Sequence, residues 1–395
     1  MARSSNIRVI VVGAGVVGCS LAMHLARAGA NVEVFDKGDV CAGMSARSGA
    51  LVRMHYTFAP EAALALESLR YFRDWSARVG GECGFVESGF ATIVDQQNVE
   101  ALRANVAMLR ALGVDTEVIT PEELRRIDPN VNLDGVALAA YEPHSGYADP
   151  VATTHAFAEA ARRAGAHFHL RTPVASIRTR AARALGAMDA AGRFHEADAL
   201  CLVTGPWTAP ILAPLGVQVP ITPERAQIAF FRREAAIRHL IYIDTITGSY
   251  FRPHDSDLTM AGLGATARDG IDPDRFREAN DAEFIADVRR RLGTRIGALA
   301  EAPYVRGHAG IYDVTPDQRP ILDEVPGIDG LYVAAGFSGT GFKTSPAVGA
   351  AMSDLILNGT MPEAIAPFSF TRFMTGDLLS GAHEYRMTSD FGHAL

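Results

Sequence analysis

Cysteine is scarce in this sequence. Four cysteines occur in 395 residues, and no two of them stand in a Cys-x-x-Cys spacing. So few cysteines in a chain of this length exclude a disulfide framework. We therefore expect free, mostly buried thiols at Cys19, Cys41, Cys83 and Cys201.

Clustered positive charge is absent as well. The formal net charge is −8, and no block of lysines or arginines interrupts the sequence. Proteins that bind a nucleic-acid backbone or an anionic membrane carry such basic clusters. We therefore expect no nucleic acid and no membrane among the partners, and a small molecule as the substrate.

The sequence also lacks long apolar runs. None reaches the roughly 18 residues that a membrane-spanning helix needs. The apolar run near the N-terminus is a short strand that leads into glycines, unlike a cleavable signal peptide. These features predict a cytoplasmic protein.

No metal-binding pattern is visible among the twelve histidines. His167 and His169, in "HFHL", would share one face of a strand, but no third ligand is evident beside them. We expect no metal.

What the sequence does contain is enough material for two packed domains. The length of 395 residues exceeds the usual size of a single core. Hydrophobic residues make up 48% of the chain and charged residues 21%, a composition typical of a globular protein.

A glycine motif stands near the N-terminus, in "IRVIVVGAGVVGCSLAMHLARAGANVEVFDKG". An apolar strand, then Gly13, Gly15 and Gly18 in G-x-G-x-x-G, then helical spacing and a second strand ending at Asp36 describe a βαβ unit. In such a unit the glycines permit a tight turn, close approach of a pyrophosphate and close helix packing. Asp36 can accept hydrogen bonds from an unphosphorylated ribose, which favours NAD or FAD over NADP.

A second glycine-rich stretch, "AAGFSGTGFKTSPAVG", follows some three hundred residues later, between a strand and a helix. Asn358 and Gly359 are expected to end that helix. Elsewhere the pattern predicts a helix from about Pro150 to Arg163, mainly helical residues over 60–110, and a strand-rich stretch over 218–325 with a helix near 281–298.

These motifs together resemble the D-amino-acid oxidase and sarcosine oxidase superfamily of flavoproteins, and the pattern is most similar to sarcosine oxidases and related secondary-amine oxidoreductases. The resemblance extends to about residue 373. The stretches that carry it are "GAGVVG" with Asp36, "SARSGALVRMHY" (45–56), "GYADP" (146–150), "VTGPW" (203–207), "YFRP" (250–253), "GIYDVTPDQRPIL" (310–322) and "GFSGTGFKTSPAVG".

The resemblance implies an α/β fold in which a Rossmann-like FAD-binding domain is interleaved with an α+β substrate domain built on a mostly antiparallel sheet. The FAD-binding domain is expected over 1–84, 145–217 and 326–373, and the substrate domain over 85–144 and 218–325. Residues 374–395 would form a C-terminal tail that matches no motif.

The resemblance also implies non-covalently bound FAD and a role for the second glycine stretch. The first stretch would hold the pyrophosphate, while amides of residues 339–342 and the helix that begins there would face the negative charge of the reduced flavin ring. The alternative is that the late glycines only form a tight turn, and Arg47 could instead form a surface salt bridge. The expected cofactor residues are Gly13, Gly15, Val16, Val17, Gly18, Asp36, Lys37, Ser45, Arg47, Ser48, Gly49, Ala50, Leu51, Val174, Thr204, Gly205, Trp207, Gly310, Gly339, Thr340, Gly341, Phe342 and Lys343.

Four residues are the expected substrate and catalytic groups. By resemblance, Arg53 and Lys343 hold the substrate carboxylate, and Tyr250 and Tyr312 line the pocket. Tyr312 falls where D-amino-acid and glycine oxidases carry an arginine, which favours secondary amines. The alternatives are a structural or phosphate-binding Arg53, a solvated Lys343, and core tyrosines.

Three departures from the family pattern limit the transfer. Gly310 stands where monomeric sarcosine oxidases attach FAD to a cysteine, and Thr340 replaces the usual histidine of that glycine stretch. The strand "SDLTMAG" lacks the lysine that assists oxygen reduction in those oxidases, so oxygen and another electron acceptor both remain open.

The sequence therefore predicts FAD-dependent oxidation of a small amino acid, N-alkylated or cyclic, to an imine by hydride transfer to flavin N5. Two alternatives are a flavoprotein subunit of a hetero-oligomeric amine dehydrogenase and an enzyme of the D-amino-acid or glycine oxidase type. The oligomeric state is open, with a homo-oligomer among the options.

Overall fold

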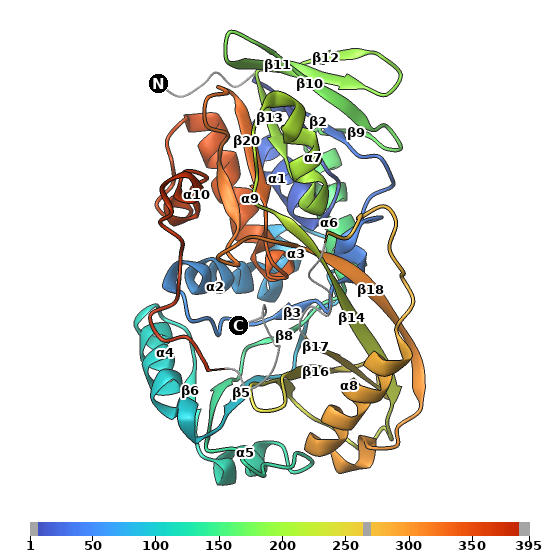
Figure 1. Ribbon diagram of the computed structural model, residues 1–395, viewed down its shortest axis with the longest axis vertical. Coiled ribbons are helices and arrows are strands. Elements are labelled where there is room, and N and C mark those ends of the chain that lie inside the picture. Colours follow the sequence, from blue (N-terminus) through green and yellow to red (C-terminus); the bar gives the residue numbers. More distant parts are fainter. Residues whose placement is uncertain (1–6, 264–269, 387–395) are drawn as a thin grey trace.

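The computed structural model describes residues 7–263 and 270–386, which form two regions stacked along the long axis of the molecule (Figure 1). The upper region contains a six-stranded sheet in the order β19-β20-β13-β1-β2-β9. Its pairings are parallel except between β19 and β20. The strands are β1 (Arg8–Val12), β2 (Asn31–Phe35), β9 (His167–His169), β13 (Ala199–Leu202), β19 (Ile321–Glu324) and β20 (Leu331–Ala335).

The central strand β1 is apolar throughout because both faces of this sheet are covered. Val9 and Val11 pack in one core with three helices, whereas Ile10 and Val12 pack in another with a three-stranded sheet. Alternate side chains of a strand point to opposite faces, so the continuous run "RVIVV" satisfies both. The covering elements are α1 (Val16–Arg27), α6 (Pro150–Arg163) and α9 (Gly341–Asn358) on one face, and β10 (Val174–Arg180), β11 (Arg183–Asp189) and β12 (Phe194–Glu196) on the other.

The lower region contains an eight-stranded sheet in the order β18-β14-β17-β16-β15-β5-β7-β6. Its neighbours are antiparallel except β15 and β5, which run parallel. The strands are β5 (Phe90–Val94), β6 (Glu117–Ile119), β7 (Leu138–Glu142), β14 (Thr222–Arg232), β15 (Ile241–Asp244), β16 (Ser249–His254), β17 (Leu258–Leu263) and β18 (Tyr304–Val314). Around it lie α4 (Val99–Ala111), α5 (Pro121–Ile127) and α8 (Ala282–Arg295).

Short elements join the two regions. A small sheet in the order β3-β8-β4 lies between them, and α2 packs against α9 beside it (Figure 1). The joining elements are β3 (Leu51–Val52), β4 (Val86–Glu87), β8 (Gly146–Tyr147) and α2 (Ala59–Arg73). The remaining helices are α3 (Trp75–Arg78), α7 (Thr208–Leu212), α10 (Arg372–Thr375) and the single-turn helices η1 (Met44–Arg47), η2 (Gln96–Asn98), η3 (Gly205–Trp207), η4 (Ala213–Leu215), η5 (Gly297–Leu299) and η6 (Ala366–Phe368).

The predicted fold class is confirmed, and so are several of its elements. The helix expected over 150–163 is α6, the one near 281–298 is α8, and Gly359 ends α9 with φ +66°. All four cysteines are free and buried. The exact domain boundaries stay a prediction, with β19 of the upper sheet lying just before the predicted boundary at residue 325. Over residues 7–263 and 270–386, each helix is too short or too polar to span a membrane.

Candidate active site

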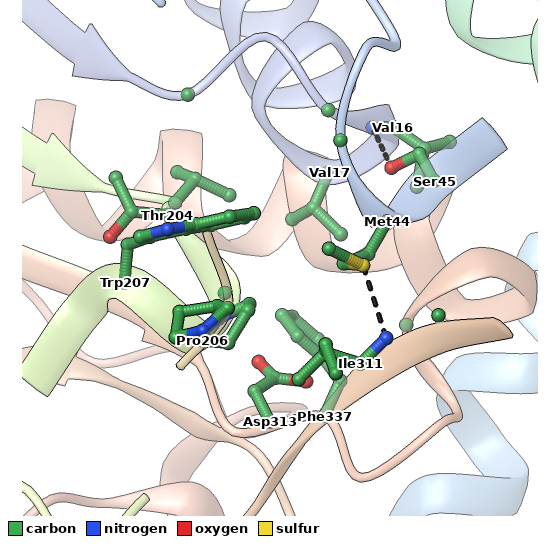
Figure 2. Close-up of a pocket in the computed structure, with 18 of the residues that line it drawn as sticks. Val16, Val17, Met44, Ser45, Thr204, Pro206, Trp207, Ile311, Asp313 and Phe337 are labelled. Atoms are coloured by element: carbon green, nitrogen blue, oxygen red, sulfur yellow. Dashed lines mark hydrogen bonds between the residues drawn. The ribbon is translucent and has the colours of Figure 1, made fainter. Parts of the chain in front are cut away.

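A cavity of about 950 Å³ lies where the two regions meet, at the carboxyl ends of β1, β2 and β13. The start of α1 and the start of α9 both reach it, and strands β14, β16 and β18 of the lower sheet close it from below. Every residue predicted from the sequence to contact cofactor or substrate lines this cavity. Figure 2 shows part of its wall, where the Met44 sulfur accepts a hydrogen bond from the Ile311 amide at 3.1 Å.

The glycines before α1 are required by close backbone approach. Gly13 has φ +116°, and a Cβ there would lie 2.3 Å from the Val203 carbonyl oxygen. A Cβ at Gly18 would lie 2.0 Å from the Gly13 oxygen. No other residue type fits at either position, so the strand, turn and helix close on one another as the motif predicts.

The N-terminus of α1 faces the cavity without a negative side chain. Its first turn holds no acidic residue, and the N-cap Gly15 has no side chain to cap it. The Val16 amide donates to Ser45 Oγ at 3.0 Å. Asp36 accepts backbone amide bonds from Ala14 and Gly38, each at 2.7 Å. A carboxylate oxygen has more than one acceptor site, so this arrangement leaves capacity for the predicted ribose contact.

Arg47 and Lys37 line the cavity and also form ion pairs across it. Arg47 lies 2.7 Å from Glu278, so the salt bridge weighed as an alternative exists together with the cavity position. Lys37 lies 2.5 Å from Asp274 and 3.9 Å from the centroid of the Trp207 ring. Asp274 and Glu278 were missed from the sequence because they belong to no motif.

The turn before α9 brings a second helix N-terminus to the same cavity. Gly336 and Gly339 have φ +73° and +94°, and the first turn of α9 has neither an acidic residue nor a side-chain cap. The Thr340 amide, one of those expected to face the flavin, instead donates to the Phe337 carbonyl at 2.9 Å. Asp313 accepts from the Gly336 amide at 2.7 Å, and burial raises the pKa of Asp313 to about 6.

The two predicted carboxylate-binding cations are both buried. Arg53 is 2% exposed and Lys343 is 6% exposed, so Lys343 is not the solvated residue of the alternative interpretation. Their charges lie 4.5 Å and 5.7 Å from the centroid of the Tyr56 ring. Burial, together with the charge of Arg53, lowers the pKa of Lys343 to about 7, against an opposing effect of Glu61. Binding of an anion in addition to Glu61 is therefore favoured beside Arg53 and Lys343.

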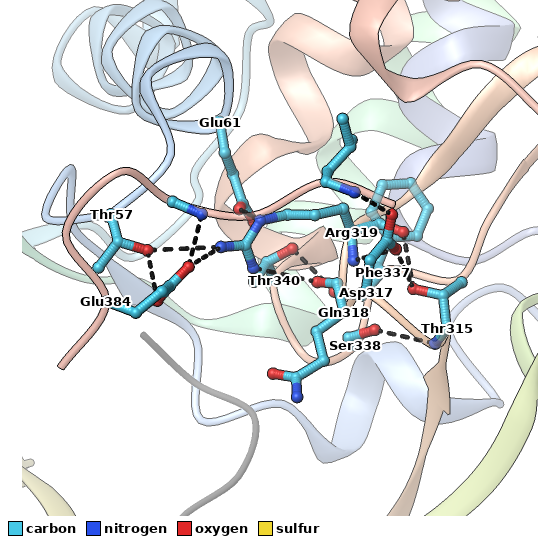
Figure 3. A network of polar contacts seen from close by, with 12 residues as sticks. Thr57, Glu61, Thr315, Asp317, Gln318, Arg319, Phe337, Ser338, Thr340 and Glu384 are labelled. Atoms are coloured by element: carbon cyan, nitrogen blue, oxygen red, sulfur yellow. Dashed lines mark hydrogen bonds and ion pairs between the residues drawn. The ribbon is translucent and has the colours of Figure 1, made fainter. Parts of the chain in front are cut away.

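A buried network around Glu61 and Arg319 was not predicted (Figure 3). Glu61 on α2 forms an ion pair of 3.2 Å with Arg319, and both are buried. Burial raises the pKa of Glu61, while Arg319 and then Lys343 act in the opposite direction. Glu61 stands in the first turn of an amphipathic helix, where an exposed acid is common, so the sequence offered no signal of its burial.

Tyr250 and Tyr312 meet inside the cavity. Their side chains are hydrogen-bonded to each other, and burial raises the pKa of both hydroxyls. A Cβ at Gly262 would lie 2.4 Å from the Tyr250 hydroxyl, and one at Gly339 would lie 3.2 Å from the Tyr312 ring. Tyr250 is thus a core residue that also lines the cavity, whereas Tyr312 is half-buried on the cavity wall.

The cavity fits an extended dinucleotide. Two helix N-termini without acidic residues stand on its walls, and glycines keep its backbone close at both. Such termini favour anionic groups. The pyrophosphate and the reduced flavin ring of FAD are two such groups on one molecule, which a nicotinamide cofactor does not match.

Comparison with known proteins supports this assignment. A sequence model of the family described as FAD-dependent oxidoreductase (DAO) matches residues 8–355. Glycine oxidase of Geobacillus kaustophilus is 26% identical over 372 residues, covering 92% of this chain and 96% of the relative. Sarcosine oxidase subunit beta of Rhodobacter capsulatus is 24% identical over 94% of this chain and 89% of its own.

A solved structure, L-proline dehydrogenase from P. horikoshii, superposes with a TM-score of 0.88 at 26% identity, covering 95% of this chain and 99% of that one. The predicted superfamily and its FAD cofactor are confirmed by these matches. The chain belongs to the DAO family of FAD-dependent oxidoreductases.

Proposed function

We propose that this enzyme oxidises a small amino acid with a secondary amine, N-alkylated or cyclic, to an imine that water then hydrolyses. The observation that carries the proposal is the pair of buried cations, Arg53 and Lys343, on the wall of a cavity that also presents the start of α9. An amino-acid carboxylate is the anion whose geometry suits an arginine fork beside a lysine.

In this proposal the protein positions the substrate, and FAD supplies the redox chemistry by accepting a hydride. Arg53 and Lys343 hold the carboxylate, which orients the C–H bond of the substrate. Tyr250 and Tyr312 form an uncharged part of the pocket, and Ile228 adds apolar surface. An uncharged pocket favours the deprotonated amine that hydride transfer requires.

Tyr312 supports the preference for secondary amines. It occupies the place where the sequence resemblance puts an arginine in D-amino-acid and glycine oxidases, and here its half-buried ring lies close to Gly339. The carboxylate is then held at the Arg53 and Lys343 side of the cavity alone. L-proline and sarcosine, named by two of the similar proteins, are suitable first substrates to test.

FAD is proposed to be held without a covalent bond. Gly310 offers no side chain for attachment, and none of the four cysteines lines the cavity. Acid denaturation should release intact FAD into solution. Flavin that precipitates with the protein would contradict this assignment.

The test of the function is anaerobic bleaching of the flavin absorbance. Sarcosine and L-proline are compared with the decarboxylated amines dimethylamine and pyrrolidine, and with glycine and D-alanine as primary amines. We expect bleaching by a carboxylated secondary amine at concentrations where its decarboxylated partner is inert. Bleaching by D-alanine or glycine alone would favour the primary-amine alternative. Equal bleaching with and without a carboxylate would contradict the proposed substrate clamp, the pair Arg53 and Lys343 that holds the carboxylate.

A second candidate is a flavoprotein subunit that works inside a hetero-oligomer, which the similarity to a sarcosine oxidase subunit beta favours. The two candidates differ in what the isolated chain can do. Steady turnover of the purified single chain with a dye or oxygen as acceptor would argue against the subunit. Bleaching in a single half-reaction without turnover would support it.

A further inference from the structure

The segment 377–386 crosses from the upper region to the lower one after α10 (Figure 1). At its start, the Leu379 amide donates to Asp317 at 3.1 Å. At its end, the Arg386 amide donates to Asn98 at 2.8 Å, and Asn98 donates back to the Arg386 carbonyl at 3.0 Å. The segment is therefore fixed to both regions by specific hydrogen bonds.

Tyr385 of this segment contacts His55, the residue that accepts a hydrogen bond from Arg53. It is 8% exposed and packs in an apolar cluster with Leu102 and Val106 of α4. Its hydroxyl lies 2.7 Å from His55 Nε2, and the two rings are stacked. The carbonyl oxygen of His55 in turn accepts a hydrogen bond from the Arg53 guanidinium.

The imidazole of His55 makes this contact as a neutral group. Burial, with the charge of Arg53 as a second cause, lowers the pKa of His55 to about 3. A neutral imidazole can exchange one hydrogen bond with the Tyr385 hydroxyl without adding a third positive charge beside Arg53 and Lys343.

Glu384, the residue before Tyr385, contacts the buried network of Arg319 and Glu61 (Figure 3). It accepts a hydrogen bond from Thr57 Oγ1 at 2.9 Å and lies 3.5 Å from Arg319. Arg319 pairs with Glu61, whose charge acts on Lys343. Two consecutive residues of the segment thus contact His55, which bonds to Arg53, and Arg319, which pairs with Glu61.

We propose that segment 377–386 positions the substrate clamp, with Tyr385 acting through His55 on Arg53 and Glu384 acting through Arg319 and Glu61 on Lys343. The proposal rests on the proposed function of the two cations. Residues 53–58 have no regular secondary structure, so Arg53 needs restraint from outside its own stretch of chain. Tyr385 and Glu384 are positioning residues and touch no reacting atom.

The test compares Tyr385→Phe with Tyr242→Phe in the full-length holoenzyme. The first change removes the hydroxyl on His55 and keeps the ring. The second removes a buried hydroxyl that donates to Asp128 at 2.9 Å outside the cavity. Only Tyr385→Phe should accelerate amide hydrogen exchange across residues 53–57. It should also raise the KM for L-proline or sarcosine about three- to tenfold, the range expected for one lost hydrogen bond, with kcat and the response to pyrrolidine little changed.

Unchanged exchange over 53–57 in Tyr385→Phe would overturn the proposal, and so would an equal effect in Tyr242→Phe. Glu384→Gln, which keeps the shape of the side chain, is the second variant should Tyr385→Phe fold poorly, and it should raise the same KM less. Failure of the proposed function is recognised separately, because wild type would then show no preference for carboxylated over decarboxylated amines.

Discussion

The starts of α1 and α9 use the same backbone device in different electrostatic surroundings. Each is a glycine turn that brings to the cavity a helix N-terminus whose own N-cap residue makes no side-chain cap. Beside the α1 start, Ser45 accepts the Val16 amide and the Asp36 carboxylate accepts the Ala14 amide. Around the α9 start lie the buried charges of Lys343, Glu61 and Arg319.

The difference matches what each end of FAD requires. A pyrophosphate keeps its charge throughout the reaction, so fixed amides and a helix dipole suffice to bind it. In the proposed function, the flavin end gains charge on reduction and lies beside the bound substrate anion, so ionisable side chains whose pKa values are shifted are useful there. Substitutions at the α1 start should therefore impair FAD binding, whereas substitutions at the α9 start should impair substrate binding.

The largest effect is expected at the α1 start, from Gly13→Ala. The new Cβ would lie 2.3 Å from the Val203 oxygen at a φ of +116°, which costs more than the roughly 1–3 kcal/mol of backbone strain alone. We expect loss of most bound FAD and a strongly lowered melting temperature. Gly359→Ala is the matched control, because Gly359 also has positive φ but no atom lies within 4 Å of its added Cβ. FAD retained at wild-type stoichiometry in Gly13→Ala would refute the steric argument.

The next effect is expected from Arg53→Ala, beside the α9 start. A charge-assisted hydrogen bond contributes about 1.5–3 kcal/mol, so binding of the substrate carboxylate should weaken about ten- to a hundredfold while FAD content survives. Arg53→Lys should restore it only in part, because a point charge does not replace the two-pronged fork.

The control for Arg53→Ala is Arg233→Ala, a buried arginine that bonds to backbone carbonyls outside the cavity. It should lower stability and leave the preference for L-proline over pyrrolidine intact. Loss of flavin in Arg53→Ala with an unchanged KM in the remaining holoenzyme would show that Arg53 supports the cofactor or the fold instead.

A smaller effect is expected from Glu61→Gln, as a shift in pH dependence. Lys343 holds a carboxylate only when protonated, and its pKa in the free enzyme is lowered to about 7, so carboxylate binding should weaken as pH rises through that value. Glu61 favours the protonated lysine, so its neutralisation should lower the pKa of Lys343 further and move this loss to lower pH. Titrations of the dissociation constant against pH, followed by flavin absorbance, measure the shift. Coincident profiles would show that Glu61 carries no charge in this range.

The smallest effect is expected from Tyr312→Phe. It removes the hydroxyl bonded to Tyr250 and keeps the ring that packs on Gly339. One neutral hydrogen bond contributes about 0.5–1.5 kcal/mol, so kcat/KM should fall about two- to tenfold. A thousandfold loss in kcat would instead assign the hydroxyl to proton transfer.

The sequence predicted the upper region better than the buried network of Glu61, Arg319 and Glu384. The βαβ unit, helix α6 and the Gly359 helix end were read directly, because glycine geometry and apolar periodicity act over a few residues. The sequence did not predict that the Thr340 amide is already hydrogen-bonded to the Phe337 carbonyl, because that bond depends on the exact geometry of the turn.

By itself, then, the sequence determined the two glycine turns and the strands and helices that flank them, because steric and hydrophobic rules are local. Most other cavity residues came from the family resemblance, and Asp274 and Glu278 were missed. Only the tertiary structure decided that Glu61, Arg319 and Glu384 meet, and that Tyr385 lies on His55. Burial and pairing of single polar side chains leave no periodic signal in a sequence. Their partners here stand tens to hundreds of residues apart, and the packing of α2, α4 and the segment 377–386 brings them together.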